Sequence, residues 1–158
     1  MLIPPPEYDE WMGFALAEAG AALATGDVPV GAVVVGPSGE LIGRGRNARE
    51  ARQDPTAHAE IDALRAAAAV LGDWQLTDAV LVVTLEPCAM CAGAILSARV
   101  PTVVFGAWDE KAGAAGSVYD LLRDRRLPQR AEVYAGVRER ECAALLTDFF
   151  EQRRSADG

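Results

Sequence analysis

Two continuous apolar runs, AVLVVTL at 79–85 and TVVFGA at 102–107, place the strongest constraint on how this chain can fold. Apolar runs of this length are typical of strands that are covered on both faces. Between them, Pro87 stands where a helix can begin, and PCAMC leads into Ile95 and Leu96. A strand, a helix and a second strand in this order require a crossover, so some parallel pairing is expected.

The amino-terminal part predicts a helix followed by a hairpin. The apolar stripe of the helix recurs at three- and four-residue steps and ends near Gly26; it contains Tyr8, Trp11, Met12, Ala15, Leu16, Ala19 and Leu23. The short runs VGAVVVG at 30–36 and ELIGRG at 40–45 follow, joined by Pro37, Ser38 and Gly39. These turn residues favour an antiparallel hairpin.

Two further helices and a weaker strand are expected. After Asp54-Pro55, Thr56 can cap an alanine-rich helix from about 57 to 71. AEVYAG at 131–136 reads as a weaker strand, and GAAGS at 113–117 as a loop. The last helix has one apolar stripe, formed by Cys142, Leu145, Leu146, Phe149 and Phe150, so Cys142 is interpreted as a core residue.

The order of these elements is helix, hairpin, helix, strand, helix, strand, strand, helix. It predicts an α/β fold with a mixed sheet of about five strands and helices on both faces. With 158 residues and no linker, we expect one domain over 1–158. The start of the chain has neither a basic stretch nor an apolar run, so we expect no secretion signal, no membrane span and a cytoplasmic location.

The charge of the chain limits its possible partners. Against 15 lysines and arginines stand 23 acidic residues, a net charge of −8, whereas a general nucleic-acid binder would be basic. Contact with RNA would therefore have to be local. The arginines gather in two groups, Arg44, Arg46, Arg49 and Arg52, and then Arg123, Arg125, Arg126 and Arg130. Each group can equally be a solvated loop or helix face.

The only histidine and two of the three cysteines lie at the starts of predicted helices. His58 stands in TAHAE and Cys88 and Cys91 in PCAMC. Taken singly, a lone histidine is more often structural, and a CxxC pair can be a redox pair or half of a structural zinc site. Together, HAE and PCAMC resemble the signature of zinc-dependent base deaminases. One nitrogen and two sulfurs would leave a fourth tetrahedral position open for water, as in a catalytic zinc site.

Glu60, two residues after the histidine, is the candidate catalytic residue. Two thiolates neutralise the formal charge of Zn²⁺, so water on this site would be less acidic than on an all-histidine site and would need a nearby base. A carboxylate can take the proton of the water and pass it to the ring nitrogen and the leaving amine. The alternative interpretation is an ordinary solvated helix residue.

Beyond these motifs the chain resembles the bacterial tRNA-specific adenosine deaminases (TadA), from about Trp11 to Arg154. The resemblance is carried by VPVGAVVV at 28–35, DPTAHAEI at 54–61, VTLEPCAMCAGA at 83–94, VVFGAWDEKAGAAGS at 103–117 and ECAALLTDFF at 141–150. It implies a three-layer α/β/α cytidine-deaminase-like fold, a homodimer and one Zn²⁺ per chain. It also implies hydrolytic deamination of adenosine to inosine at the wobble position of a tRNA anticodon.

The resemblance also implies two substrate contacts. Asn47 matches the position that contacts the target base, and an amide can pair with the edge of a purine. Asp109 matches a residue near the RNA ribose, where a carboxylate can accept from a 2′-OH. A turn asparagine and a plain loop aspartate are the alternatives. Trp108 in place of a common arginine, and 127–129 in place of a frequent Asn-His pair, are departures from the family that leave the tRNA footprint open.

Two other classes of protein remain open at this point. A guanine or cytosine deaminase would share the zinc core and need no RNA. A non-catalytic zinc-stabilised binding module would have a saturated metal site and no need for Glu60.

Overall fold

The computed structural model describes residues 3–158 and has one five-stranded mixed sheet. The strands lie in the order β2-β1-β3-β4-β5, with bounds β1 Gly31–Val35, β2 Leu41–Arg46, β3 Val80–Leu85, β4 Thr102–Ala107 and β5 Glu132–Tyr134. β1 pairs antiparallel with β2 and β3, whereas β3, β4 and β5 are parallel. The predicted hairpin, the predicted parallel pairing and the mixed sheet are confirmed.

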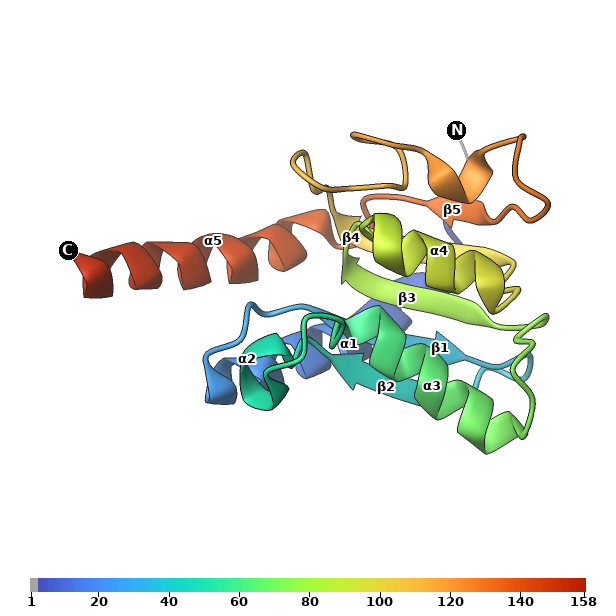
Figure 1. The fold of residues 1–158 in the computed structure, drawn as a ribbon, viewed down its shortest axis with the longest axis horizontal. Coiled ribbons are helices and arrows are strands. Elements are labelled where there is room, and N and C mark those ends of the chain that lie inside the picture. Colours follow the sequence, from blue (N-terminus) through green and yellow to red (C-terminus); the bar gives the residue numbers. More distant parts are fainter. Residues whose placement is uncertain (1–2) are drawn as a thin grey trace.

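Helices cover both faces of the sheet and form a three-layer arrangement (Figure 1). One face carries α1 (Glu7–Ala21) and the start of α5 (Glu139–Asp157), and the other carries α3 (Ala59–Leu71) and α4 (Ala89–Ser97). Alternate side chains of β1 and β3 enter the two cores, with Val34 and Val83 on the α3–α4 side and Val33 and Val82 on the α1 side. The far end of α5 projects away from the sheet (Figure 1).

The antiparallel and parallel halves of the sheet meet at β3. Leu85 at the carboxyl end of β3 pairs with Ala107 at the carboxyl end of β4. The segment leading into α4 and the loop after β4 therefore leave the same edge of the sheet. Glu86 N donates to Ala107 O at 2.8 Å just beyond the last strand pair. This edge is where the carboxyl-end loops of the parallel strands can converge on a site.

α3 lies unusually close to β2 because the strand offers glycines beneath it. A Cβ on Gly45 would stand 2.1 Å from the carbonyl oxygen of Ala59, and one on Gly43 would stand 2.3 Å from that of Ala63. Neither distance is possible for real atoms, so only glycine fits at these two positions. Contact between the two backbones thus sets the distance between the first turns of α3 and strand β2.

Several details differ from the expectations. α3 begins at Ala59 with His58 as its N-cap residue, whereas Thr56 donates from N and Oγ1 to Asp54 Oδ1 in the preceding turn. A one-turn helix, α2 (Arg49–Arg52), and two 3₁₀ turns, 22–25 and 121–123, were not predicted.

Two apolar positions were placed wrongly. Leu23 is 45% exposed because α1 continues as a 3₁₀ turn, and Phe150 is 46% exposed because only the first part of α5 lies on the sheet. Cys142, by contrast, is buried as predicted and packs above Gly106. Over residues 3–158, no helix combines the length and apolar character needed to cross a bilayer.

Candidate active site

Three potential metal ligands meet at the amino-terminal ends of two helices. His58 is the N-cap residue of α3, Cys88 is that of α4, and Cys91 lies in the first turn of α4. The Nδ1 atom of His58 is 3.7 Å from the Sγ of Cys88 and 3.4 Å from that of Cys91. All three ligand atoms lie within 4.8 Å of one another. The structure therefore brings together the residues that the sequence predicted as metal ligands.

The protonation of this cluster is set by its own hydrogen bonds. The side-chain hydrogen bond with Cys91, supported by His58 and opposed by burial, lowers the pKa of Cys88 to about 3. The hydrogen bond to Cys88 and then burial raise the pKa of Cys91, and the hydrogen bond to Cys88 raises that of His58. A lowered pKa favours the thiolate form of Cys88, and a divalent cation bound to the cluster would favour the deprotonated forms of all three ligands.

The donor set fits a catalytic zinc ion. One imidazole nitrogen and two thiolate sulfurs are ligands that Zn²⁺ prefers, and three protein ligands leave one tetrahedral position for water. Both cysteines lie at a helix amino terminus, where free N–H groups stabilise thiolates. These three residues could hold the ion with the helix starts placed as they are in this structure.

Glu60 lies in the first turn of α3, within the same pocket as His58. Only 4% of the residue is exposed, and burial raises the pKa of its carboxyl. A carboxyl with a raised pKa can both take up and return a proton near neutral pH. This environment is unlike that of a solvated helix residue, which was the alternative interpretation from the sequence.

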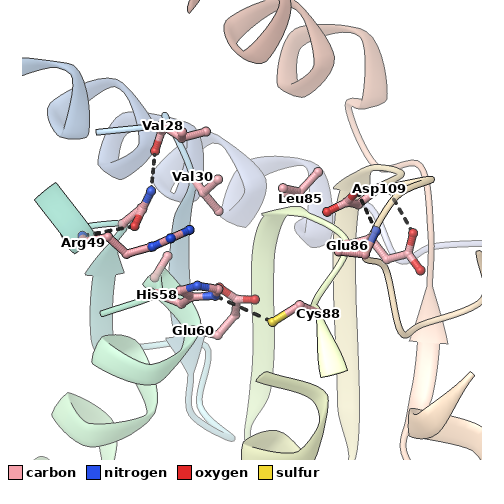
Figure 2. A pocket seen from close by; sticks show the side chains of 12 residues that line it. Val28, Val30, Arg49, His58, Glu60, Leu85, Glu86, Cys88 and Asp109 are labelled. Atoms are coloured by element: carbon pink, nitrogen blue, oxygen red, sulfur yellow. Dashed lines mark hydrogen bonds between the residues drawn. The ribbon is translucent and has the colours of Figure 1, made fainter. Parts of the chain in front are cut away.

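A pocket of about 230 Å³ opens above these residues (Figure 2). Its lining is mixed, and consists of Val28, Val30, Asn47, Arg49, His58, Ala59, Glu60, Leu85, Glu86, Cys88, Asp109 and Ala112. Val28, Val30 and Leu85 offer apolar surface to a flat ring, while the polar groups converge from several elements. Such a mixture is typical of sites that bind small organic groups.

The side chain of Asn47 is held in one orientation at the wall of the pocket. Its Nδ2 donates to Val28 O at 3.1 Å, and its Oδ1 accepts from Arg49 N at 3.3 Å. One N–H of the amide is left over by these two bonds. Asn47 is buried and lines the pocket.

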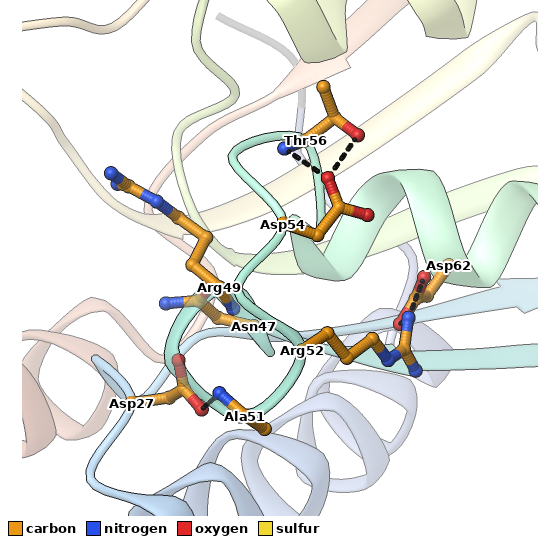
Figure 3. A network of polar contacts seen from close by, with 8 residues as sticks. All are labelled: Asp27, Asn47, Arg49, Ala51, Arg52, Asp54, Thr56 and Asp62. Carbon is orange, nitrogen blue, oxygen red and sulfur yellow. Dashed lines mark hydrogen bonds and ion pairs between the residues drawn. The ribbon is translucent and has the colours of Figure 1, made fainter.

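Asp27 is a buried residue next to the segment that lines the pocket, and the sequence did not indicate it. Its carboxylate is fully buried and accepts from Glu50 N at 2.7 Å, Ala51 N at 3.2 Å and Thr25 Oγ1 at 2.5 Å. Figure 3 shows it beneath the turn that carries Asn47 and Arg49. Burial disfavours its charged form, but the three hydrogen bonds outweigh burial and hold the pKa of Asp27 below its usual value.

Asp109 stands on the opposite wall, in the loop that follows β4. Its Oδ1 accepts from Lys111 N and from Ala112 N, both at 3.1 Å, while its own N–H donates to Glu86 Oε1 at 3.0 Å. Glu86 is buried and was also missed from the sequence. The groups that donate to Glu86 belong to residues more than twenty positions away, so no local sequence pattern indicates these hydrogen bonds.

The structure shows which arginines of the two groups form ion pairs and which one lines the pocket. Arg44, Arg52, Arg123 and Arg126 form ion pairs with Glu18, Asp62, Asp120 and Asp124, respectively. Among the described residues that line the pocket, Arg49 alone carries a permanent positive charge, and its side chain extends towards His58 (Figure 2). Ion pairing on the surface thus accounts for half of the two groups, and Arg49 faces the pocket.

Comparisons with known proteins agree with this arrangement. Residues 7–154 match the family model of the MafB19-like deaminases. Among solved structures, a chain from a study of A-to-I editing by tRNA:A34 deaminases at the wobble position of transfer RNA has a TM-score of 0.83 at 42% identity, over 87% of this chain and 99% of that one. Guanine deaminase from Nitrosomonas europaea has a TM-score of 0.76 at 28% identity, over 94% and 86%. The chain is therefore a deaminase with a cytidine-deaminase-like fold.

Proteins of similar sequence show to which family of deaminases the chain belongs. A tRNA-specific adenosine deaminase of Bacillus subtilis is 47% identical over 144 residues, which cover 91% of this chain and 89% of that protein. The chain belongs to the family of the tRNA-specific adenosine deaminases, as the motifs of its sequence indicated.

Proposed function

We propose that this chain converts adenosine to inosine at the wobble position of a tRNA anticodon by hydrolysis, with one water consumed and one ammonia released. The observation that carries the proposal is the buried Glu60 carboxyl in one pocket with His58 and Cys88. The Bacillus subtilis relative and the tRNA:A34 deaminase structure support adenosine in tRNA as the substrate.

The cofactor in this proposal is one Zn²⁺ per chain, held by His58, Cys88 and Cys91. When bound there, zinc would lower the pKa of a water molecule at its remaining position and so supply the attacking oxygen. Only one such cluster of nitrogen and sulfur ligands is found within residues 3–158.

Glu60 moves the protons. It takes a proton from the attacking water, delivers one to N1 of adenine as the oxygen adds to C6, and passes one to the amine that leaves as ammonia. Its buried position supports these roles, because burial raises the pKa of the carboxyl and so favours its protonated form relative to an exposed glutamate. The walls of the pocket would exclude bulk water from these transfers.

Asn47 and Asp109 orient the nucleotide. The remaining N–H of the Asn47 amide would donate to an acceptor on the purine edge. The Asp109 carboxylate would accept from the ribose 2′-OH, which distinguishes RNA from DNA at this position. Their places on opposite walls of the pocket support this division.

Sequencing of tRNA treated with the purified protein tests the proposed substrate directly. We expect inosine in place of adenosine at the wobble position and unchanged adenosines elsewhere. A matched stem-loop forced into a duplex should remain unmodified, because extrusion of a paired base costs a few kcal/mol. Deamination of free guanine with tRNA left untouched would instead favour the guanine deaminase function.

Salt dependence separates the same alternatives. Binding of an RNA loop should weaken with salt by a slope of about −0.7 per phosphate contact, whereas binding of a neutral base should hardly change. Zinc without turnover of either substrate would favour a non-catalytic binding module.

We further propose that the chain acts as a single domain, as a homodimer and in the cytoplasm. The family resemblance supports the dimer. A partly apolar surface supports it too: Val70 on α3 is 67% exposed, Met90 on α4 is 38% exposed, and Trp74 in the loop after α3 is 59% exposed. Sedimentation at micromolar concentration should give twice the chain mass of 16.7 kDa. A single species at the chain mass would overturn the homodimer.

A further inference from the structure

Glu86 is a buried carboxylate at the centre of the loop that forms one wall of the pocket. It follows β3 directly, stands two residues before Cys88, and is 2% exposed. No lysine or arginine within residues 3–158 forms an ion pair with it. A buried charge without a partner cation is costly, so hydrogen bonds have to stabilise it.

The hydrogen bonds to Glu86 come from one loop, the rim loop, defined here as 109–117. Oε1 accepts from Asp109 N at 3.0 Å, and Oε2 accepts from Ala115 N at 2.9 Å and Ser117 N at 3.1 Å. The hydroxyl of Ser117 lies 2.9 Å from Oε2 and 2.7 Å from the carbonyl oxygen of Asp109. Both ends of the rim loop are therefore tied to one carboxylate.

The middle of the rim loop is fitted to the same group. A Cβ on Gly113 would stand 2.3 Å from the Glu86 carboxyl, so the loop backbone approaches as closely as glycine allows. Ala114 N donates to Pro87 O at 2.7 Å, and Gly113 forms an isolated bridge with Cys88. The rim loop is thus bound to the segment that carries the proposed metal ligand.

We propose that Glu86 is a positioning residue that sets Asp109 against the nucleotide. This proposal rests on the proposed function. Glu86 holds the backbone N–H of Asp109, and two N–H groups of the next turn hold Asp109 Oδ1. The direction of the Asp109 carboxylate therefore follows the position of Glu86. These hydrogen bonds do not bring Glu86 or Asp109 into contact with the atoms that react.

A glutamine cannot replace Glu86 in this arrangement. Both oxygens of the carboxylate accept, and donors face them from both sides. An amide would turn its NH₂ either towards Asp109 N, where it opposes one donor, or towards Ala115 N and Ser117 N, where it opposes two. Glu86→Gln keeps the volume of the side chain but must release one end of the rim loop.

The first test is a direct observation of the loop by fluorine NMR on protein labelled with 5-fluorotryptophan. Trp108 precedes the rim loop and packs on Phe105, whereas Trp11 and Trp74 lie on α1 and after α3. In Glu86→Gln we expect the Trp108 resonance to shift or broaden and the other two to stay. An unchanged Trp108 resonance would overturn the proposal, and this arm does not depend on activity.

The second test is kinetic and uses an anticodon stem-loop with a wobble adenosine. Glu86→Gln should raise KM roughly tenfold, which corresponds to the loss of one hydrogen bond to a charged group, with kcat within about threefold. Zinc content should stay at the level of the wild type. A fall in kcat together with loss of zinc would show that Glu86 merely supports the metal site, against the proposal.

A double-mutant cycle separates positioning from general destabilisation. If Glu86 acts through Asp109, Glu86→Gln should change KM less than twofold in an Asp109→Ala background. An undiminished tenfold rise in that background would refute the proposal. Ser117→Ala, which removes one donor and keeps the carboxylate, should raise KM about threefold and lose this effect in the same background. It tests the proposal even where Glu86→Gln fails to fold.

The failure of this proposal can be distinguished from the failure of the proposed function. Wild-type protein that makes no inosine would refute the proposed function alone, while the NMR arm would still report on the rim loop. If the wild-type protein makes inosine but the effects of Glu86→Gln and Asp109→Ala on KM are additive, only the role of Glu86 is refuted.

Discussion

The Nδ1 atom of His58 lies 3.4 Å from the Sγ of Cys91, although 33 positions separate the two residues. The contact joins the start of α3 to the first turn of α4, on the same face of the sheet. It makes the cluster of candidate metal ligands dependent on two helices at once. A change at one helix start should therefore disturb the cluster as a whole.

His58→Ala should lose the bound zinc, since two sulfurs alone give an incomplete site. Metal analysis of purified protein checks this, with about one zinc per chain expected for the wild type. Cys142→Ala is the matched control, because the third cysteine is buried on the other face of the sheet and should leave the zinc in place. Full zinc content in His58→Ala would mean that the ligand assignment is wrong.

Glu60→Gln should slow deamination by roughly 10²- to 10⁴-fold or more, because one group serves several proton transfers. Zinc and folding should persist, since Glu60 is outside the ligand set. Asp62→Asn is the control, as Asp62 lies in the same helical turn and pairs outward with Arg52. Single-turnover inosine formation and zinc analysis on one sample decide the matter; a zinc-loaded Glu60→Gln within tenfold of wild type would contradict the mechanism.

Arg49→Ala should reduce the salt slope of RNA binding by about 0.7, the value for one phosphate contact on a single strand. The guanidinium lines the pocket and has no carboxylate partner among the ion pairs of residues 3–158. Arg52→Ala, from the same one-turn helix, removes an arginine that already pairs with Asp62 and should leave the slope unchanged. Equal slopes for wild type and Arg49→Ala would exclude the phosphate contact.

Asp27→Asn should lower the free energy of unfolding by about 1–3 kcal/mol at pH 7, because the amide must oppose one of the N–H donors of α2. The folded-state pKa of Asp27 lies below the unfolded value of about 3.9, so its stabilisation is complete above that pH. It is lost as the pH falls through the folded-state pKa.

Denaturant titrations of Asp27→Asn and wild type should therefore converge as the pH is lowered below 4. Asp78→Asn changes an exposed carboxylate in the loop before β3 and should differ from wild type by under about 0.5 kcal/mol at each pH. A difference for Asp27→Asn that persists unchanged to pH 2 would show that the charge of Asp27 is not responsible.

The layers of the fold could be predicted because they follow from local patterns. The apolar runs at 79–85 and 102–107 appear as β3 and β4, and HAE and PCAMC appear at the two helix starts that meet. Each of these motifs indicates both where a helix begins and which residue is a candidate metal ligand. The three candidate ligand positions could therefore be proposed without coordinates.

The supports of the pocket could not be found in this way. Asp27 and Glu86 act through backbone N–H groups more than twenty positions away, and backbone donors leave no mark in a sequence. α2 is a single turn and too short for a periodic pattern. The place of Arg49 at the pocket could not be predicted for a different reason, because the ion pairs that distinguish Arg49 from neighbouring arginines depend on tertiary contacts.

The close contact between α3 and β2 has a consequence for how this chain tolerates change. Where side chains fill an interface, substitutions accumulate as small shifts of one element over another. At Gly45 the backbones themselves touch, so repacking of the surrounding core cannot move Ala59 closer to the strand. The position of the first turn of α3, which carries Glu60, relative to β2 is therefore set by this backbone contact. The same contact makes Gly45 a position where a single added methyl group would displace α3 from β2 and, with it, the candidate site residues at the start of the helix.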